Sequence, residues 1–513
     1  MVKNRSIVGI YIITYEYVIE TAILPKIIYT KSNILTFMFS TKSNRDRTGA
    51  ISGKAIAVAV IAIFIVAAVA GAIYLTANHK PTTSSSKTTL TINWSLAGSE
   101  GSYMAKTVIP LFEKAYPNIT VQYSTLSAST IISSLLSQES AHHVSVNIIE
   151  EDNMEMGALV SQGLVTPLNP YLSQLEPMNG SSTGITGSGA IIPAYYKEGL
   201  FNGTYYFFPF RGNVQLAYYN QSALTKVHAT VQPNNATNLM TDMMLLNSNG
   251  YSHPFNMQGH GGASTPTQVF QWMAEFGGNP MVFNTTGDIA ALTYLQNMMR
   301  AGLMSPNNAT GYWGSYKGLA ANNYQYINQW PYVTSLLGGL GMNNTTNAAS
   351  SGTRYNLGVA PVFAGPNNNA QYVVGGDVLG IPANSPNVWA SLDWMKFVNS
   401  YQIQKDLLMN LSWPVVNELA YQNLPSSISY LFGYFHYEES HGIFRPAVPW
   451  MTQWNAVFDT AWGVIIGNNG NVTHALSQAN SSMLNYLKIY YANNVAAYQS
   501  GSYYPSGDYT GPT

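Results

Sequence analysis

The stretch LTINWSLAGSEGSYMAKTVIPLFEKAYPNITVQY, residues 90–123, holds the pattern that decides the fold. Residues 90–94 alternate between apolar and polar side chains and end at a Gly/Ser turn, whereas residues 103–115 place apolar side chains at helical spacing. Residues 119–123 alternate again. A strand, a helix and a second strand in this order predict parallel strands, with ligands bound beyond their carboxyl ends.

The alternation continues along the chain, with a helix expected over residues 128–138, a third strand over 144–149 and a helix over 153–162. Further helices are expected near residues 266–276, 288–301, 389–399, 402–409 and 473–493, and further strands near 356–360 and 373–381. The sequence therefore predicts an α/β protein. Its last residues, 500–513, are rich in Gly, Tyr and Ser and are expected to form a disordered tail.

The composition excludes several classes of function. Of the 513 residues only 9% are charged, and beyond residue 80 there are 13 basic and 20 acidic residues, a net charge of −7. A surface that tracks phosphates, and with it nucleic-acid binding, is therefore not expected. The chain has no cysteine, which excludes disulfides, thiolate metal sites and thiol nucleophiles.

Residues 55–75 form an uncharged apolar run of 21 residues. As a helix this run would be about 31 Å long, enough to cross one bilayer. Lys54 and two nearby arginines lie on its N-terminal side, so we expect that side to be cytoplasmic and residues 81–513 to face outward.

The residues before this run, TGAISGK at 48–54, resemble the basic leader of archaeal class III (pilin-like) signal sequences, which a peptidase cuts before the helix. An uncleaved N-terminal anchor is the alternative. Residues 1–37 fit neither description, and we expect translation to start at Met38.

Residues 76–89 are expected to form a stalk rich in Ser and Thr. Thirteen N-x-[ST] sequons follow it, and their density agrees with an exported glycoprotein. An Asn-rich chain also produces sequons by chance.

Eight short motifs occur in the order found in the family 1 extracellular solute-binding proteins of ABC importers, the group that includes maltose-binding protein. They are LFEKAYPN at 111–118, GLVTPL at 163–168, YYFFPF at 205–210, AYYN at 217–220, NQW at 328–330, GVAP at 358–361 with GP and GG at 365–366 and 375–376, the tryptophan-containing helix at 389–399, and WPV at 413–415. The chain resembles this family from about residue 90 to residue 487. It departs from the family in Asn220-Gln-Ser, which lacks the usual Lys-Asp, and in Trp413, which replaces a smaller residue.

This resemblance implies a two-lobed α/β fold of the periplasmic-binding-protein type (type II), each lobe a mixed sheet flanked by helices, after the N-terminal transmembrane helix. The N-lobe would comprise residues 90–210 and 374–415, and the C-lobe residues 211–373 and 416–499. The chain would pass between lobes near residues 209–213, 372–377 and 414–418, and the lobes would close on a ligand between them.

The resemblance also implies a function without cofactors: binding of a mono- or oligosaccharide and its delivery to the permease subunits of an ABC importer. Because no GxxxxGK motif occurs, the ATPase would be a separate chain. The expected location is the outer face of the cytoplasmic membrane.

Sugar recognition needs flat apolar faces for pyranose rings and planar polar side chains for hydroxyl pairs. Tryptophans in or near loops or at helix starts supply the faces: Trp94, Trp313, Trp330, Trp413, Trp450 and Trp454. The alternative for each of these tryptophans is packing in the core. Trp454 is the strongest candidate, because it lies in a segment that resembles the one supplying a stacking tryptophan in maltose-binding protein. Polar candidates lie at strand ends and crossings: Ser99, Glu100, Glu151, Asp152, Arg211, Asn213, Gly376 and Asp377. A helix cap or a solvated loop is the alternative for each of these.

Catalysis is not expected. Glu150, Glu151 and Asp152 are adjacent, and neighbouring strand residues point to opposite faces, so they cannot form a glycosidase pair. The GSSTG sequence at 180–184 lies in a Gly/Ser loop, and the histidines lack metal-ligand spacing. Two alternatives to a solute-binding protein stay open: a structural or filament-forming surface glycoprotein, and a carbohydrate-active hydrolase.

Overall fold

The computed structural model describes residues 87–504 except 97, 176–190, 230–233, 260–263, 305–314, 344–354, 363 and 367–370. The expected leader, the membrane helix, nearly all of the stalk and Trp313 lie outside these residues. The described residues all belong to one compact unit. Among them, no helix is both long enough and apolar enough to cross a membrane.

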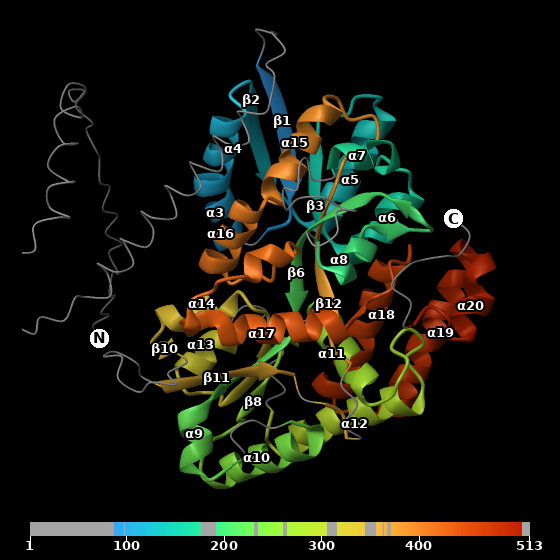
Figure 1. Ribbon diagram of the computed structural model, residues 1–513. Coiled ribbons are helices and arrows are strands. Elements are labelled where there is room, and N and C mark those ends of the chain that lie inside the picture. Colours follow the sequence, from blue (N-terminus) through green and yellow to red (C-terminus); the bar gives the residue numbers. More distant parts are fainter. Residues whose placement is uncertain are drawn as a thin grey trace, which may run out of the picture. The chain divides into compact units, whose positions relative to one another are not determined.

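The first sheet begins with the two strands of the alternating stretch, β1 and β2, and is completed by strands from later in the chain (Figure 1). Strand β1 (Thr88–Trp94) pairs in parallel with β2 (Ile119–Thr125) and β3 (Ile148–Asp152). Strand β12 (Val373–Gly380) runs antiparallel to β3 on one side and to β6 (Phe207–Val214) on the other, and the short β13 (Ile443–Phe444) extends the β3 side.

Helices join and cover these strands. After β1 the chain forms α3 (Gly98–Tyr103), a π-helical turn at Met104–Val108 and α4 (Ile109–Ala115), so the helix predicted as one piece contains a π segment. Helix α5 (Ala128–Ser140) begins where Ser127 accepts a hydrogen bond from the Thr130 amide. A 3-10 turn at Asn153–Glu155 and α6 (Met156–Ser161) follow β3.

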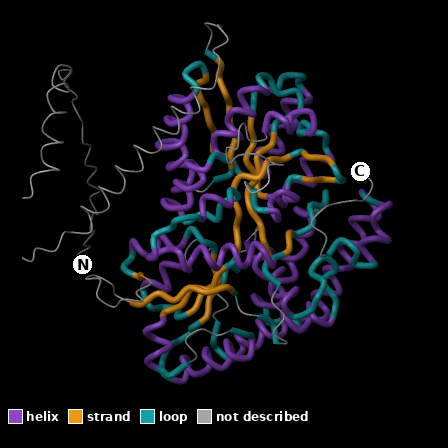
Figure 2. Tube along the Cα trace, in the orientation of Figure 1, coloured by secondary structure: helices purple, strands orange, loops and turns teal. Residues whose placement is uncertain are grey.

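The second sheet has the order β10-β11-β7-β9-β8. Its strands form the lower orange group in Figure 2. Its central strand β7 (Leu216–Asn220) is antiparallel to β11 (Tyr355–Pro361) and β9 (Tyr326–Gln329). The short strands β10 (Met342–Asn343) and β8 (Phe255–Asn256) form the edges.

Helices of the second half flank both sheets. They are α9 (Gln221–Lys226), α10 (Ala236–Ser248), α11 (Ser264–Glu275), α12 (Thr286–Arg300), α13 (Ser315–Ala320), α14 (Val333–Gly339), α15 (Val388–Val398), α16 (Tyr401–Leu411), α17 (Ser426–His441), α18 (Met451–Trp462), α19 (Val472–Tyr490) and α20 (Val495–Gln499). The shorter pieces are α7 (Leu172–Leu175), α8 (Pro193–Glu198) and the hairpin of β4 (Leu200–Phe201) and β5 (Thr204–Tyr205). Helix α17 packs on β11 of the second sheet and on β6 and β12 of the first, so it joins both.

Three segments lie where the two sheets meet. Only Gln215 separates β6 of the first sheet from β7 of the second, and the chain returns from β11 to β12. The third segment comprises residues 413–416. Within it Val415 pairs with Arg211, and the Gly212 amide donates to the Pro414 carbonyl at 2.9 Å. The side chain of Gln404 fixes this segment, because it accepts from the Val416 amide at 2.9 Å and donates to the Phe210 carbonyl at 3.0 Å.

Three sequence-based expectations are wrong. The third strand begins four residues later than predicted and contains Glu150–Asp152, because these residues pair with β1 and β12. Ser99 and Glu100 lie within α3 rather than in a loop. Residues 500–504 are not a loose tail, since Tyr503 is buried against Trp450 with ring centroids 5.1 Å apart.

Burial also restricts the sequons. Asn93 lies in β1 and is 5% exposed, and Asn220 is 1% exposed and caps α9 through the Ala223 amide. A folded chain cannot present either side chain to a glycosylating enzyme.

Candidate functional site

A row of charged side chains crosses the first sheet near the carboxyl ends of β1 and β3. Asp377 of β12 is directly opposite Arg211 of β6 on one side and Asp152 of β3 on the other. Directly opposed residues of antiparallel strands share one face of a sheet. The carboxyl end of the parallel strands is where open α/β sheets bind ligands.

Arg211 is the centre of the first charged cluster. Its guanidinium donates to Asp377 and, through Nη1, to Glu100 Oε1 at 2.9 Å, and it lies 4.5 Å above the ring of Trp413. Trp413 Nε1 donates to the same Glu100 oxygen at 2.7 Å. Because these residues come from β6, β12, α3 and the third segment, the cluster ties together the parts of the chain that meet between the sheets.

Glu150 adds a third carboxyl to this cluster. It is 1% exposed and accepts a hydrogen bond from the Ser95 amide at 2.8 Å. Burial, and then the negative charge of Asp377, hold the pKa of Glu150 well above its ordinary value, although Arg211 acts in the opposite direction.

Arg445 is the centre of a second cluster. It donates to Asp152 Oδ1 and Asn153 Oδ1 at 3.1 Å each and to the Thr267 hydroxyl at 2.7 Å. Asn153 in turn donates to Glu198 at 2.9 Å. Burial lowers the pKa of Arg445, while Asp152 opposes this effect.

Glu151 and Glu155 extend the second cluster without a cation of their own. Glu151 is fully buried and neither of its carboxyl oxygens has a hydrogen-bond donor. Glu155 accepts from Thr452 of α18 at 3.1 Å. Burial raises the pKa of both carboxyls, and for Glu151 the charges of Glu155, Asp152 and Asp377 raise it further.

The remaining polar candidates differ in position. Asn213 is half-buried in β6 and is opposite Gly375, whereas Ser99 is exposed in α3. A side chain on Gly376 would clash with the Arg211 carbonyl, so glycine is required there for the close approach of β6 and β12.

Trp94 and Trp330 are both buried and both contact protein groups. Trp94 is 1% exposed, stacks on Tyr123 at 4.6 Å and donates to Thr125 at 2.9 Å. Trp330 is 8% exposed, and its Nε1 donates to Gln258 at 2.8 Å.

Trp450 and Trp454 lie at the start of α18 and are buried. Trp454 is fully buried and stacks on Phe283 and Phe458, with centroids 4.9 and 5.6 Å away, while its Nε1 donates to the Pro280 carbonyl at 3.2 Å. Trp450 packs between α18 and the C-terminal Tyr491 and Tyr503. In this conformation both rings belong to an aromatic core.

The sequence-based candidate set missed Arg445, Asn153, Glu155 and Glu198. The EEDNME run at 150–155 contains Glu151, Asp152 and Glu155, three acidic residues of the second cluster. A dense acidic stretch was therefore the available signal. The pairing of Arg445 with Asp152 spans 293 positions and has no local signal.

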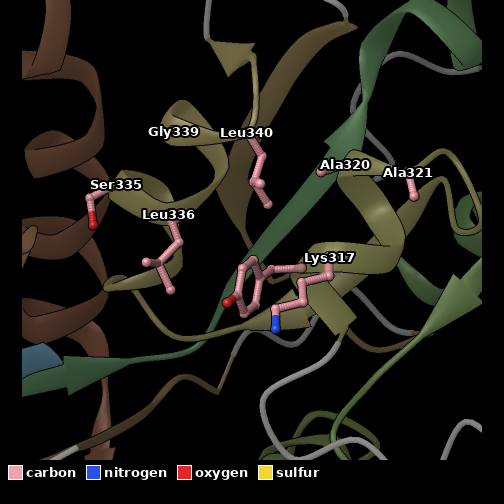
Figure 3. Close-up of a pocket in the computed structure, with 8 residues that line it drawn as sticks. Lys317, Ala320, Ala321, Ser335, Leu336, Gly339 and Leu340 are labelled. Atoms are coloured by element: carbon pink, nitrogen blue, oxygen red, sulfur yellow. The ribbon is translucent and has the colours of Figure 1, made fainter. Parts of the chain in front are cut away.

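A hollow of about 570 Å³ lies elsewhere, between α13 and α14 (Figure 3). Leu336, Leu340, Ala320 and Ala321 make most of its lining apolar, and Lys317 is its charged member. It lacks the grouped polar side chains that characterise the charged row. No three His, Cys, Asp or Glu side chains in the described part of the chain are arranged to hold a metal ion.

Solved structures of sugar- and polyol-binding proteins share this fold at low sequence identity. Maltose-bound MalE3 of T. maritima is 18% identical, with a TM-score of 0.64 over 77% of this chain and 98% of that one. The GacH receptor of Streptomyces glaucescens, solved with acarbose, is 15% identical, with a TM-score of 0.64 over 78% of this chain and 99% of that one. A Thermotoga lettingae solute-binding protein with bound α-D-tagatose is 18% identical, with a TM-score of 0.64 over 77% of this chain and 98% of that one.

The sequence itself matches a family model over most of the region that forms the two sheets. The model described as bacterial extracellular solute-binding protein covers residues 97–405. Members of this family bind substrates and are not enzymes, which agrees with the absence of a catalytic motif in the sequence. The chain belongs to the bacterial extracellular solute-binding protein family.

Proposed function

We propose that this chain binds a mono- or oligosaccharide between its two lobes and delivers it to the permease of an ABC importer, whose ATPase is a separate chain. The observation that carries the proposal is the charged row Arg211, Asp377 and Asp152, which crosses three strands of the first sheet next to the segments between the sheets and lies at the carboxyl end of β3. The sugar or polyol ligands named for the similar structures agree with it.

Each proposed lobe is centred on one sheet, although the end of β6 from Arg211 onward and the short β13 of the first sheet fall in the C-lobe. We assign residues 90–210 and 374–415 to the N-lobe and 211–373 and 416–499 to the C-lobe. Movement of one lobe against the other would open and close the site at the three segments between the sheets.

The proposed contacts divide into direct and supporting ones. Asp152 and Asn213 would reach the sugar from the strands, and Glu151, which is fully buried, would reach it after a change of conformation. Arg211, Glu100, Asp377, Gly376 and Trp413 would hold the strands at the site, since their side chains are engaged with one another or fill a close approach. The remaining tryptophans are proposed as apolar surfaces for the sugar: Trp94, Trp313, Trp330, Trp450 and Trp454. Four of them, all except Trp313, are buried in the structure and would contact the sugar only after a change of conformation that exposes them.

An N-terminal helix over residues 55–75 would hold the chain at the outer face of the membrane, so that captured sugar stays close to the permease. A membrane fraction that retains the chain after a high-salt wash and releases it only in detergent is the expected result.

The experiment for binding is a thermal-shift series on the purified full chain with sugars, polyols, peptides and amino acids. A ligand that binds only the folded state raises the midpoint by RT ln(1 + [L]/Kd). Midpoint increases confined to sugars or polyols are expected. An unchanged midpoint with all sugars, or a shift with peptides alone, would contradict the proposal.

A further inference from the structure

Three buried carboxyls lie where the two sheets meet. Glu275 is at the end of α11, and Glu438 and Glu439 are near the end of α17; these residues are 1%, 0% and 2% exposed. Helix α17 packs on β11 of the second sheet and on β6 and β12 of the first, and α11 packs on β12. We call Glu275, Glu438 and Glu439 the junction acids, because they lie between elements of both sheets.

Glu275 is connected to the first two segments between the sheets. The side-chain oxygen of Gln271 in α11 accepts from Gln215 Nε2 and from the Val373 amide, at 3.2 Å each. The side-chain nitrogen of Gln271 donates to Glu275 Oε1 at 3.0 Å. Because Gln215 separates β6 from β7 and Val373 begins β12, these hydrogen bonds join both segments to one carboxyl.

Glu438 and Glu439 are connected to the second and third segments. Glu438 Oε1 accepts from the amide of Val362, just after β11, at 3.3 Å. Glu439 accepts from the Tyr421 hydroxyl at 3.4 Å, and this hydroxyl accepts from the Val415 amide at 2.8 Å. The junction acids are thus connected by hydrogen bonds to all three segments.

Each junction acid has the contacts of a neutral carboxyl rather than of a charged one. One oxygen of each accepts a hydrogen bond, whereas the other, Oε2 in all three, is buried without a partner. None of the ion pairs between described residues includes any of the three. A buried charge without a cation or a full set of donors is unfavourable, so the folded junction favours the protonated form.

The titratable groups around the junction acids are mainly neutral or acidic. Six of them are tyrosines: Tyr195, Tyr326, Tyr372, Tyr421, Tyr437 and Tyr504. The acids Glu198, Asp242 and Asp288 lie near three of these tyrosines. Neither a tyrosine hydroxyl nor a further acid stabilises an ionised junction acid as a cation would.

Two cationic side chains lie on elements of the junction, and neither forms an ion pair with a junction acid among the described residues. Arg211 of β6 is paired with Glu100 and Asp377. His436 is exposed on α17, and its ring contacts that of Tyr421 with centroids 6.5 Å apart.

Burial raises the pKa of all three junction acids, and that of Glu439 to about 8. For Glu438 the charges of Glu275 and Glu439 act in the same direction as burial. A junction that binds protons more tightly when it is closed is stabilised in acid. This stabilisation is lost as pH rises through the raised pKa values.

We propose that the junction acids make the hinge between the lobes respond to pH. In acid the neutral carboxyls hold the three segments together. When the carboxyls ionise they move towards water, their contacts with the segments weaken, and the lobes separate more widely. No solute is needed for this response, so it can be tested independently of sugar binding.

The test measures the separation of the lobes by double electron–electron resonance between nitroxide labels on the full chain without solute. Since the chain has no cysteine, two introduced cysteines carry the only labels. Leu136→Cys and Met244→Cys, at exposed positions, place one label on α5 of the N-lobe and one on α10 of the C-lobe. The population with the longer separation is expected to rise about tenfold or more between about pH 5 and pH 8.

Two labels within the N-lobe form the control pair. Leu136→Cys and Trp389→Cys are both at exposed positions and should keep one separation over the same pH range. Equal distributions at both pH values for the pair that spans the lobes, in a folded chain, would overturn the proposal. An equal change in the control pair would also overturn it, because a general loosening would then explain both.

Variants assign the response to the carboxyls. Glu275→Gln, Glu438→Gln and Glu439→Gln, combined in one chain, keep an oxygen at each position and cannot ionise, so the lobe separation at pH 8 should equal that at pH 5. Glu113→Gln is the matched control and should respond like the parent chain, since Glu113 of α4 also accepts from a backbone amide, that of Val121 at 2.8 Å.

A combined variant that still responds like the parent chain would overturn the assignment. Where the combined variant does not fold, the three single variants replace it, and each is expected to reduce the rise by about twofold or more. A full rise in all three single variants would overturn the assignment as well.

Discussion

Two regions of this chain bury carboxyl groups in different ways. Around Arg211, the carboxyls of Glu100 and Asp377 contact a guanidinium group. Around α17, Glu439 is 2% exposed and accepts hydrogen bonds from the neutral hydroxyls of Tyr195 and Tyr421, at 2.9 and 3.4 Å. The first arrangement is stable with the carboxyls charged, and the second with the carboxyl protonated, so the two regions respond to different perturbations.

The largest expected effect concerns pH and the α17 region. Burial raises the pKa of Glu439 from 4.5 to about 8, although both tyrosine hydroxyls lower it. Because the folded state holds the proton more tightly than the unfolded state, the stabilisation is complete below the unfolded pKa and is lost as pH rises towards the folded one. Between about pH 4.5 and pH 8 this carboxyl alone should remove about 4 to 5 kcal/mol of unfolding free energy.

Urea unfolding at a series of pH values measures this slope. The variant Glu439→Gln keeps an oxygen for the tyrosines and cannot ionise, so its profile should be flatter over that range. A parent chain that becomes more stable from acid to neutral pH would contradict the description of this region.

Arg211→Met tests the other region. Removing the guanidinium leaves Glu100 and Asp377 buried beside Glu150 without a cation, and breaking a buried ion pair on one side costs about 3 to 5 kcal/mol. Chemical denaturation at neutral pH measures the loss. Arg300→Met is the control, since Arg300 is exposed and donates to Asn469, and a change comparable to that of Arg211→Met would show that the cluster has no special role.

The fold was largely predictable because its signals are local. The alternation in residues 90–123 and the helix expected over residues 128–138 depend on near neighbours, and the structure has them within a few residues. The third strand was misplaced, because strand residues as acidic as Glu150–Asp152 are stabilised only by pairing with β1 and β12.

The site was predictable only in part, for a related reason. Arg211 and Asp377 could be chosen as candidates from their positions near the crossings, but their contact spans 166 positions. Whether Trp454 is surrounded by Phe283 and Phe458 depends on how α18 packs, which no local pattern specifies.

Trp413→Phe is expected to have an intermediate effect. The phenyl ring keeps a face under the Arg211 guanidinium but loses the 2.7 Å hydrogen bond to the buried carboxylate of Glu100. A hydrogen bond to a charged group contributes about 1.5 to 3 kcal/mol. Denaturant midpoints should therefore lie between those of the parent chain and Arg211→Met, and a loss as large as that of Arg211→Met would mean that the indole, rather than the arginine, organises the cluster.

The smallest effect is expected at a single ion pair that resembles the Arg211 cluster in chemistry but has a more exposed cation. Lys396 and Asp393 of α15 are 3.1 Å apart at (i, i+3) spacing, and the side chains are 25% and 9% exposed. Water and salt reach the lysine end of this pair, so Lys396→Met should reduce the unfolding free energy by about 1 kcal/mol or less at low salt and by less still at high salt. The Arg211→Met loss should change little with salt, because its carboxylates are buried. If both losses decreased equally with added salt, water would reach the Arg211 cluster as freely as it reaches α15, and the contrast between the two ways of burying carboxyls would not hold.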